Sequence, residues 1–319
     1  MPHETTLITG VGGFVGRHLA ELLVKSGAFV YGTILSPEEV SSDNPIPGVE
    51  LMVCHLENQS NVEEVINSVQ PSVVYHLAAQ SSVSRSLSDP IGTFKTNVMG
   101  TLHLLESLRG LPNLRVLVLI SSAEVYGIVS ESDLPITERA SLDPANPYAC
   151  SKACADLLGV QYFRIFQVPV IRLRPFNHIG PGQSDAFVAS NFARQIAEIE
   201  AGIRPPKLMV GNLDAKRDFT DVRDIVRAYV LAAERCSPGD VYNICSGKAV
   251  SIREVLDQLL TLTSVQIEVV QEPDRMRPSD LPILVGDCSK FHAETGWAPE
   301  ISLAQTLKDL LNFWRARVS

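Results

Sequence analysis

Short apolar runs alternate with longer amphipathic stretches through the first half of the chain. The apolar runs, rich in Val, Ile and Leu, occupy residues 6–9, 28–31, 51–53, 72–77 and 116–121. Stretches with helical spacing follow or separate them, at residues 14–25, 61–68, 92–108 and 148–166. Near-continuous apolar strands separated by helices are typical of a parallel sheet covered on both faces. The pattern therefore predicts an α/β fold with a doubly wound parallel sheet.

This rhythm changes after about residue 176. Turns rich in Gly and Pro now separate isolated helices, which the pattern predicts at residues 188–201 and 252–261. We expect residues 1–176 to form the parallel-sheet domain. We expect residues 177–319 to form mainly a smaller C-terminal α/β domain, with some of its segments returning to the main sheet.

Three glycines lie between the first predicted strand and the first predicted helix. Gly10 permits a tight turn, Gly13 lets the backbone approach a pyrophosphate, and Gly16 lets the helix pack on the strand. The first helical residues, Phe14 and Val15, carry N–H groups that favour phosphate. Glycine-rich turns also occur for conformational reasons alone, but the strand before and the helix after favour function. The motif predicts a Rossmann-type site for a nicotinamide dinucleotide.

The end of the second predicted strand bears on which dinucleotide binds. An acid about 20 residues after the glycine motif would bind the 2′-hydroxyl of NAD, but no acid occurs there before Glu38. No arginine replaces it, although Arg17 lies near the glycine turn. This favours NADP as the cofactor, with NAD as the alternative.

A second group of polar residues has the chemistry of proton transfer. Tyr148 and Lys152 stand four residues apart, so they share one helix face, and a neighbouring ammonium lowers the pKa of a phenol. Ser122 and Glu124 follow a buried strand, where ligands bind in open α/β sheets. A tyrosine and lysine at this spacing are often an ordinary surface pair. In combination with the glycine turn and Ser122, they indicate a general acid or base.

These motifs together resemble the extended short-chain dehydrogenase/reductase family, in the branch that acts on nucleotide-linked sugars. The resemblance extends through nearly the whole chain, in the order and spacing of the family's motifs. It implies that Ser122 binds the sugar oxygen, Tyr148 transfers the proton, and Lys152 holds the cofactor ribose and tunes the tyrosine. Further cofactor contacts implied by the motifs are Leu56, Leu77, Ala78, Ala79 and Asn97. The implied substrate contacts are Asn177, Val188, Arg217, Arg277 and Asp280.

Within the family, residues 174–183 and 277–280 resemble the members that use GDP-sugars. The implied reaction is NAD(P)H-dependent reduction of the 4-keto group of GDP-4-keto-6-deoxy-D-mannose to GDP-D-rhamnose. The alternatives are a GDP-mannose 4,6-dehydratase or another nucleotide-sugar epimerase or dehydratase. Glu124 stands where a dehydratase has its base, yet residues 180–183 lack the dehydratase's paired arginines. A non-catalytic NAD(P)-sensing protein is disfavoured by the intact Ser122, Tyr148 and Lys152.

Composition narrows the classes of partner. The 319 residues include 27 Lys and Arg against 36 Asp and Glu, and the net charge of −9 disfavours general nucleic-acid binding. No apolar run approaches the roughly 20 residues that cross a bilayer, and no signal-like segment opens the sequence. Six scattered cysteines predict reduced thiols, no metal site and a cytoplasmic location. The family resemblance implies a homodimer, paired through residues 92–108 and 148–166.

Overall fold

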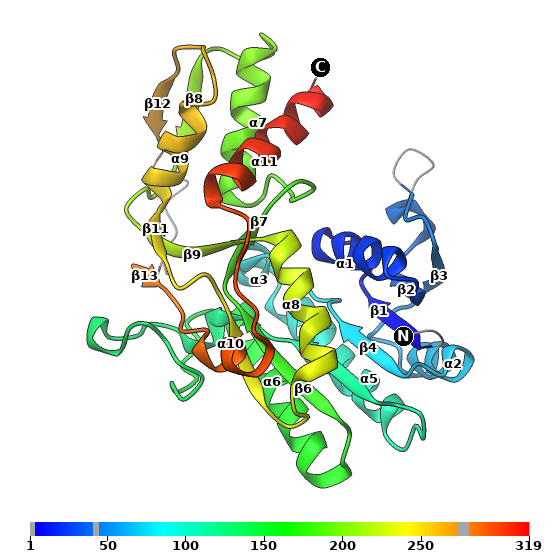
Figure 1. Cartoon of the computed structure of the whole chain (residues 1–319). Helices are drawn as coiled ribbons and strands as arrows, with labels where there is room; N and C mark the ends of the chain where they lie inside the picture. Colours follow the sequence, from blue (N-terminus) through cyan, green and yellow to red (C-terminus); the bar gives the residue numbers. More distant parts are fainter. Residues whose placement is uncertain (1–3, 41–44, 273–280, 319) are drawn as a thin grey trace.

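The computed structural model describes residues 4–40, 45–272 and 281–318. Its centre is a sheet of seven parallel strands in the order β10-β6-β5-β4-β1-β2-β3 (Figure 1). These strands span Thr5–Thr9 (β1), Phe29–Ile34 (β2), Val49–Val53 (β3), Val73–His76 (β4), Val116–Ile120 (β5), Val170–Pro175 (β6) and Val241–Ile244 (β10). The strand order changes direction between β1 and β4, and ligands bind at such a point, outside the carboxyl ends of the strands. The predicted doubly wound parallel sheet is confirmed.

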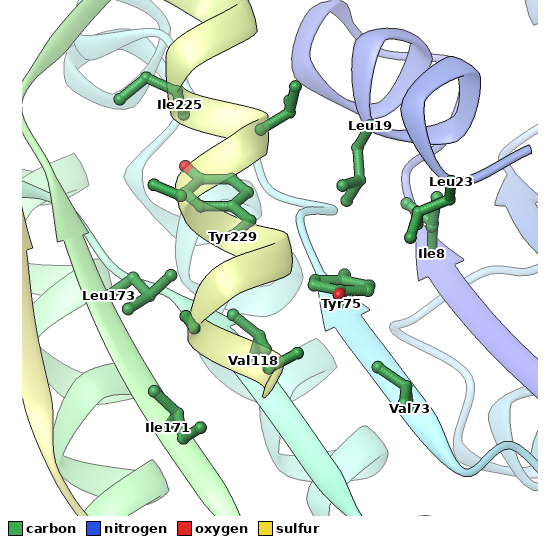
Figure 2. Close-up of a cluster of buried hydrophobic side chains, with 14 of the residues drawn as sticks. Ile8, Leu19, Leu23, Val73, Tyr75, Val118, Ile171, Leu173, Ile225 and Tyr229 are labelled. Atoms are coloured by element: carbon green, nitrogen blue, oxygen red, sulfur yellow. The ribbon is translucent and has the colours of Figure 1, made fainter. Parts of the chain in front are cut away.

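The strands are apolar at nearly every position because both faces of the sheet are covered. Successive side chains point to opposite faces, so Ile8 and Val118 pack under α1 and α8, as Figure 2 shows. Their neighbours Leu7 and Leu117 pack on the other face, under α2, α5 and α6. These helices span Phe14–Lys25 (α1), Gln59–Val69 (α2), Gly100–Leu108 (α5), Pro147–Phe166 (α6) and Val222–Arg235 (α8).

The helix expected at residues 92–108 is not one regular helix. It consists of α4 (Pro90–Phe94), a π-helical turn η2 (Lys95–Met99) and α5. Such π turns widen the helix by one residue and are frequent at functional sites. In this turn lies Asn97, whose side chain is buried. Hydrophobic periodicity could not reveal the extra residue, because the apolar positions on either side still match a helix.

A smaller lobe forms most of the second half of the chain. It contains a four-stranded sheet with β9 between β11 and β13 and with β7 beside β9, and a separate pair of strands, β8 and β12. Its core joins α7, α9 and α11. The elements span Asn177–Ile179 (β7), Val188–Glu200 (α7), Lys207–Val210 (β8), Lys216–Asp221 (β9), Ala249–Ser251 (β11), Ile252–Leu260 (α9), Glu268–Gln271 (β12), Ile283–Leu284 (β13) and Leu303–Val318 (α11).

Three elements after residue 176 lie in the main sheet domain. Strand β10 pairs with β6, helix α8 packs against α1, β5 and β6, and helix α10 (Ser289–Thr295) packs against β10 and α8. Short elements complete the described chain: η1 (Pro37–Glu39), α3 (Val83–Ser88), η3 (Ala123–Tyr126) and η4 (Glu131–Asp133). Across the described ranges, no helix combines the length and apolar character that spanning a membrane requires.

Candidate active site

The glycine turn after β1 lies against the segment that follows β4. Gly10 has a φ of 72°, and a Cβ there would lie 2.8 Å from the Cα of Ala78. At Gly16 a Cβ would lie 2.7 Å from the Cα of Val11, so only glycine lets α1 pack this close to the turn. The conformation and the close contacts both explain why the sequence has glycine at these two positions.

The turn presents open backbone at the start of α1. Gly13 is exposed and precedes the helix without a side-chain cap. Phe14 and Val15 lie in the first turn of the helix, where N–H groups have no partner within the helix. The ring of Phe14 stacks on His178 of β7, with ring centroids 6.2 Å apart. Free amides, a positive helix end and an uncovered glycine fit the pyrophosphate of a dinucleotide.

Four of the remaining predicted cofactor residues follow the carboxyl ends of β4 and β3. Leu77, Ala78 and Ala79 follow β4, and the Ala78 amide donates to Thr9 Oγ1 at 3.2 Å. Leu56 is only 5 % exposed and packs in the core. The side chain of Leu56 therefore contributes to packing under α5.

Asn97 has protein partners at both ends of its amide. Its Oδ1 accepts from the backbone N–H of Gln80 at 2.7 Å. Its Nδ2 donates to the backbone carbonyl of Gln80 at 3.0 Å and to Ser151 Oγ at 2.9 Å. Ser151 Oγ in turn donates to the carbonyl of Tyr148. Asn97 thus joins the segment after β4 to the helix that carries Tyr148 and Lys152.

Ser122, Tyr148 and Lys152 meet at the carboxyl end of β5. Ser122 is the second residue after that strand, and its hydroxyl interacts with the Tyr148 phenol. Lys152 is buried and its Nζ donates to the carbonyl of Ile120, the last residue of β5. Burial lowers the pKa of Lys152 to about 8, so the ammonium predominates at neutral pH.

The pKa of Tyr148 differs from the sequence expectation. Burial raises it to about 12; the hydrogen bond with Ser122 acts in the opposite direction, and the Glu124 carboxylate adds to the rise. The expected lowering by Lys152 is absent because the ammonium is directed to the backbone of β5. At neutral pH Tyr148 is therefore a neutral phenol, the form that can donate a proton.

Glu124 lies at the same end of β5. The amide nitrogen of Asn146 donates to its Oε2 at 3.4 Å, while the other end of the Asn146 amide caps α6. The carboxylate is near enough to Tyr148 to influence its pKa. The structure thus brings all four predicted catalytic side chains to one place.

The predicted substrate residues belong to the smaller lobe. Asn177 lies on β7, Val188 begins α7, and Arg217 lies on β9, where it donates to the carbonyls of Lys216 and Leu281. Arg277 and Asp280, also predicted, lie outside the described residues.

Of four buried side-chain oxygens that lack protein partners in the part of the chain that the structure describes, two lie at or next to predicted site residues. They are Asn177 Oδ1 and Ser121 Oγ, the latter beside Ser122 at the end of β5. Buried polar atoms are normally hydrogen-bonded, so these two fit a site that is completed by a polar ligand.

Comparison with known proteins defines the family. The family model described as GDP-mannose 4,6 dehydratase matches residues 7–310. The chain belongs to this family. It is 37% identical to GDP-6-deoxy-D-mannose reductase of Pseudomonas aeruginosa over 99% of this chain and 98% of that protein. GDP-mannose 4,6-dehydratase of Vibrio cholerae is 29% identical, over 98% and 93% of the two chains.

A solved structure of a family relative is also similar. The structure of RMD from Pseudomonas aeruginosa complexed with NADPH has a TM-score of 0.85 and 36% identity, and the match covers 98% of this chain and 100% of that one. The predicted resemblance to the nucleotide-sugar branch of the extended short-chain dehydrogenase/reductase family is confirmed.

Several positioning residues of the family site were not predicted. Asn146 caps α6 just before Pro147, and Asn-Pro before a helical pattern is a known start signal, so the sequence contained a clue. Ser151 and Asp156 carried no signal. Their partners lie on other elements, Asn97 on η2 for Ser151, and Arg172 and Arg174 on β6 for Asp156.

Proposed function

We propose that this chain catalyses the NAD(P)H-dependent reduction of the 4-keto group of GDP-4-keto-6-deoxy-D-mannose to GDP-D-rhamnose. The observation that carries the proposal is the meeting of Ser122 and Tyr148 at the carboxyl end of β5, beside a glycine turn suited to a dinucleotide. Full-length similarity to a GDP-6-deoxy-D-mannose reductase supports the substrate class.

Each residue of the site has a distinct chemical role in the proposed reaction. A bound reduced nicotinamide supplies the hydride to the ketone carbon. Tyr148, a neutral phenol with a pKa of about 12, donates its proton to the developing alkoxide. The Ser122 hydroxyl orients the carbonyl oxygen, and the buried Lys152 fastens α6 to the end of β5 through the carbonyl of Ile120. Asn97 and Ser151 hold the helix that positions these groups.

Replacing Tyr148 by Phe tests this assignment. The change removes the proton donor, and we expect kcat to fall by about 10²–10⁴-fold. Equilibrium binding of the cofactor should be unchanged, because the glycine turn is intact. If turnover persisted near the wild-type rate, Tyr148 would not be the proton donor.

A 4,6-dehydratase is the second candidate because of one observation, the Glu124 carboxylate beside Tyr148. The purified protein would be incubated with GDP-mannose and with its 4-keto-6-deoxy derivative, each with NADPH or NADH, and the sugar products identified. A reductase consumes the reduced cofactor stoichiometrically with the ketone. Conversion of GDP-mannose without added reductant, lost in Glu124→Gln, would instead support the dehydratase.

We also propose that the protein is a homodimer in the cytoplasm. Five large apolar side chains are exposed over α3, α4, η2 and α6: Leu87, Ile91, Met99, Leu157 and Ile165. Exposed apolar surface of this kind is typical of protein interfaces. Light scattering should find a dimer, and Ile91→Asp should shift it to the monomer. Cell fractionation tests the location, which rests on the cysteine usage.

A further inference from the structure

An acidic side chain lies beside the glycine turn, although it does not come from the end of β2. Strand β2 ends at Ile34 without a carboxylate, but the short helix η1 turns the chain back toward the turn. There the side chain of Glu39 packs against Gly12: a Cβ on Gly12 would lie 2.8 Å from Glu39 Oε2 and 3.5 Å from Glu39 Cβ. The Glu39 carboxylate therefore lies directly beside the backbone of the glycine turn.

Arg17 keeps η1 at this place. Its Nε donates to Gly12 O at 2.9 Å, and its Nη2 donates to Glu39 O at 3.0 Å. One guanidinium therefore ties the glycine turn to the residue that carries the carboxylate. The turn is bonded to β2 as well, since the Val11 amide donates to Thr33 O at 3.0 Å. The carboxylate therefore stands on the β2 side of the turn, the side on which dinucleotide-binding folds hold the adenosine ribose.

We propose that Glu39 sets the preference of this chain between NADH and NADPH, and that Arg17 is the positioning residue that holds it there. The carboxylate accepts hydrogen bonds from the ribose 2′-hydroxyl of NADH and repels the 2′-phosphate of NADPH. The inference rests on the proposed function only in that a nicotinamide dinucleotide binds at the glycine turn. It does not depend on which sugar is reduced.

The charges at the site give the direction of each effect. Glu39 is exposed, so water and salt screen its repulsion of a phosphate. Its effect on the affinity for NADPH is therefore a small factor. The guanidinium of Arg317, on α11, acts on Arg17 electrostatically, so positive charge also lies near and favours phosphate. Glu39 thus counteracts a background that attracts NADPH, and its loss should shift the preference toward NADPH.

The experiment measures equilibrium binding of NADPH and NADH by fluorescence, without any sugar. In Glu39→Gln we expect the ratio of NADPH affinity to NADH affinity to rise by about tenfold. The substitution removes the repulsion of the 2′-phosphate of NADPH, and it also removes the charged acceptor for the 2′-hydroxyl of NADH. The matched control is Glu38→Gln, in the same short helix, whose carboxylate bonds to Ser36. We expect the control to leave the ratio within about twofold. Higher salt should reduce the difference between wild type and Glu39→Gln.

Arg17→Lys tests the positioning role, since lysine keeps the charge but cannot bridge Gly12 and Glu39. The ratio should move in the same direction as in Glu39→Gln, by a smaller factor, and the double variant should add nothing further. An unchanged ratio in Glu39→Gln, or an equal change in Glu38→Gln, would overturn the inference. Wild-type protein that bound a dinucleotide yet reduced no keto sugar would contradict only the proposed function. Failure to bind either dinucleotide would refute both.

Discussion

Two buried polar networks hold the candidate site, and they differ in charge. Behind the glycine turn, His76 joins Thr9 and Thr101 through its two ring nitrogens, at 2.8 and 3.0 Å. On α6, the helix that also carries Tyr148 and Lys152, Asp156 accepts from Arg172 and Arg174 of β6. The first network is neutral and joins segments far apart in the sequence, whereas the second is ionic and joins the consecutive elements α6 and β6.

The neutral network has a single consistent arrangement of donors. The Thr101 hydroxyl donates to the carbonyl of Asn97 at 2.6 Å, so His76 Nε2 donates to Thr101 and Nδ1 accepts from Thr9. Burial lowers the pKa of His76 to about 3, and the Lys152 charge acts in the same direction. The ring therefore stays neutral at physiological pH.

Removing one member should destabilise the protein more in the ionic network than in the neutral one. Asp156 is fully buried, and burial alone would raise its pKa, but the two arginines hold the pKa below its usual value. Arg174 also donates to the hydroxyl of Tyr126, in the short helix that follows Ser122. Removing the carboxylate leaves two buried cations without an anionic partner, which costs more than a lost neutral hydrogen bond.

The largest effect is therefore expected for Asp156→Ala. The free energy of unfolding should fall by about 3–5 kcal/mol, measured by urea denaturation. Lys25→Ala, which breaks an exposed pair with Glu21, is the control and should cost less than about 1 kcal/mol. Similar losses in the two variants would show that the buried ions contribute no more than a surface pair.

A smaller loss is expected for His76→Gln. We expect about 1–3 kcal/mol in the same denaturation experiment, because Thr9 and Thr101 keep other hydrogen bonds, to the Ala78 amide and the Asn97 carbonyl. A loss larger than that of Asp156→Ala would reverse the ranking of the two networks.

The smallest effect is expected for the change in the free energy of unfolding in mild acid. Below pH 6.5 the unfolded His76 takes up a proton, whereas the folded ring does so only near its pKa of about 3. Stability therefore falls as the pH falls through this window, by about 1 kcal/mol from pH 6 to pH 5. Asp156, with a lowered pKa, contributes only at still lower pH. His76→Gln should flatten the slope between pH 6 and pH 5, and an unchanged slope would mean that His76 is not its source.

Much of the fold and part of the site follow from local sequence. Strands such as Val116–Ile120 and the turn at Gly10 and Gly16 are recognisable because near-neighbour spacing determines strand burial and turn geometry. The same holds for the helical spacing of Tyr148 and Lys152. The pKa of Tyr148 was predicted in the wrong direction, because burial and the partner of Lys152 depend on how α6 docks on β5.

The sequence by itself determined that a doubly wound sheet holds a dinucleotide turn and a tyrosine–lysine pair. Only the tertiary structure decided that β10 joins the main sheet, that Asn97 is bonded to Ser151, and that Glu39 packs on Gly12. The first set depends on residues a few positions apart, whose geometry the backbone imposes. The second set depends on contacts between distant segments, which form only when whole elements pack together.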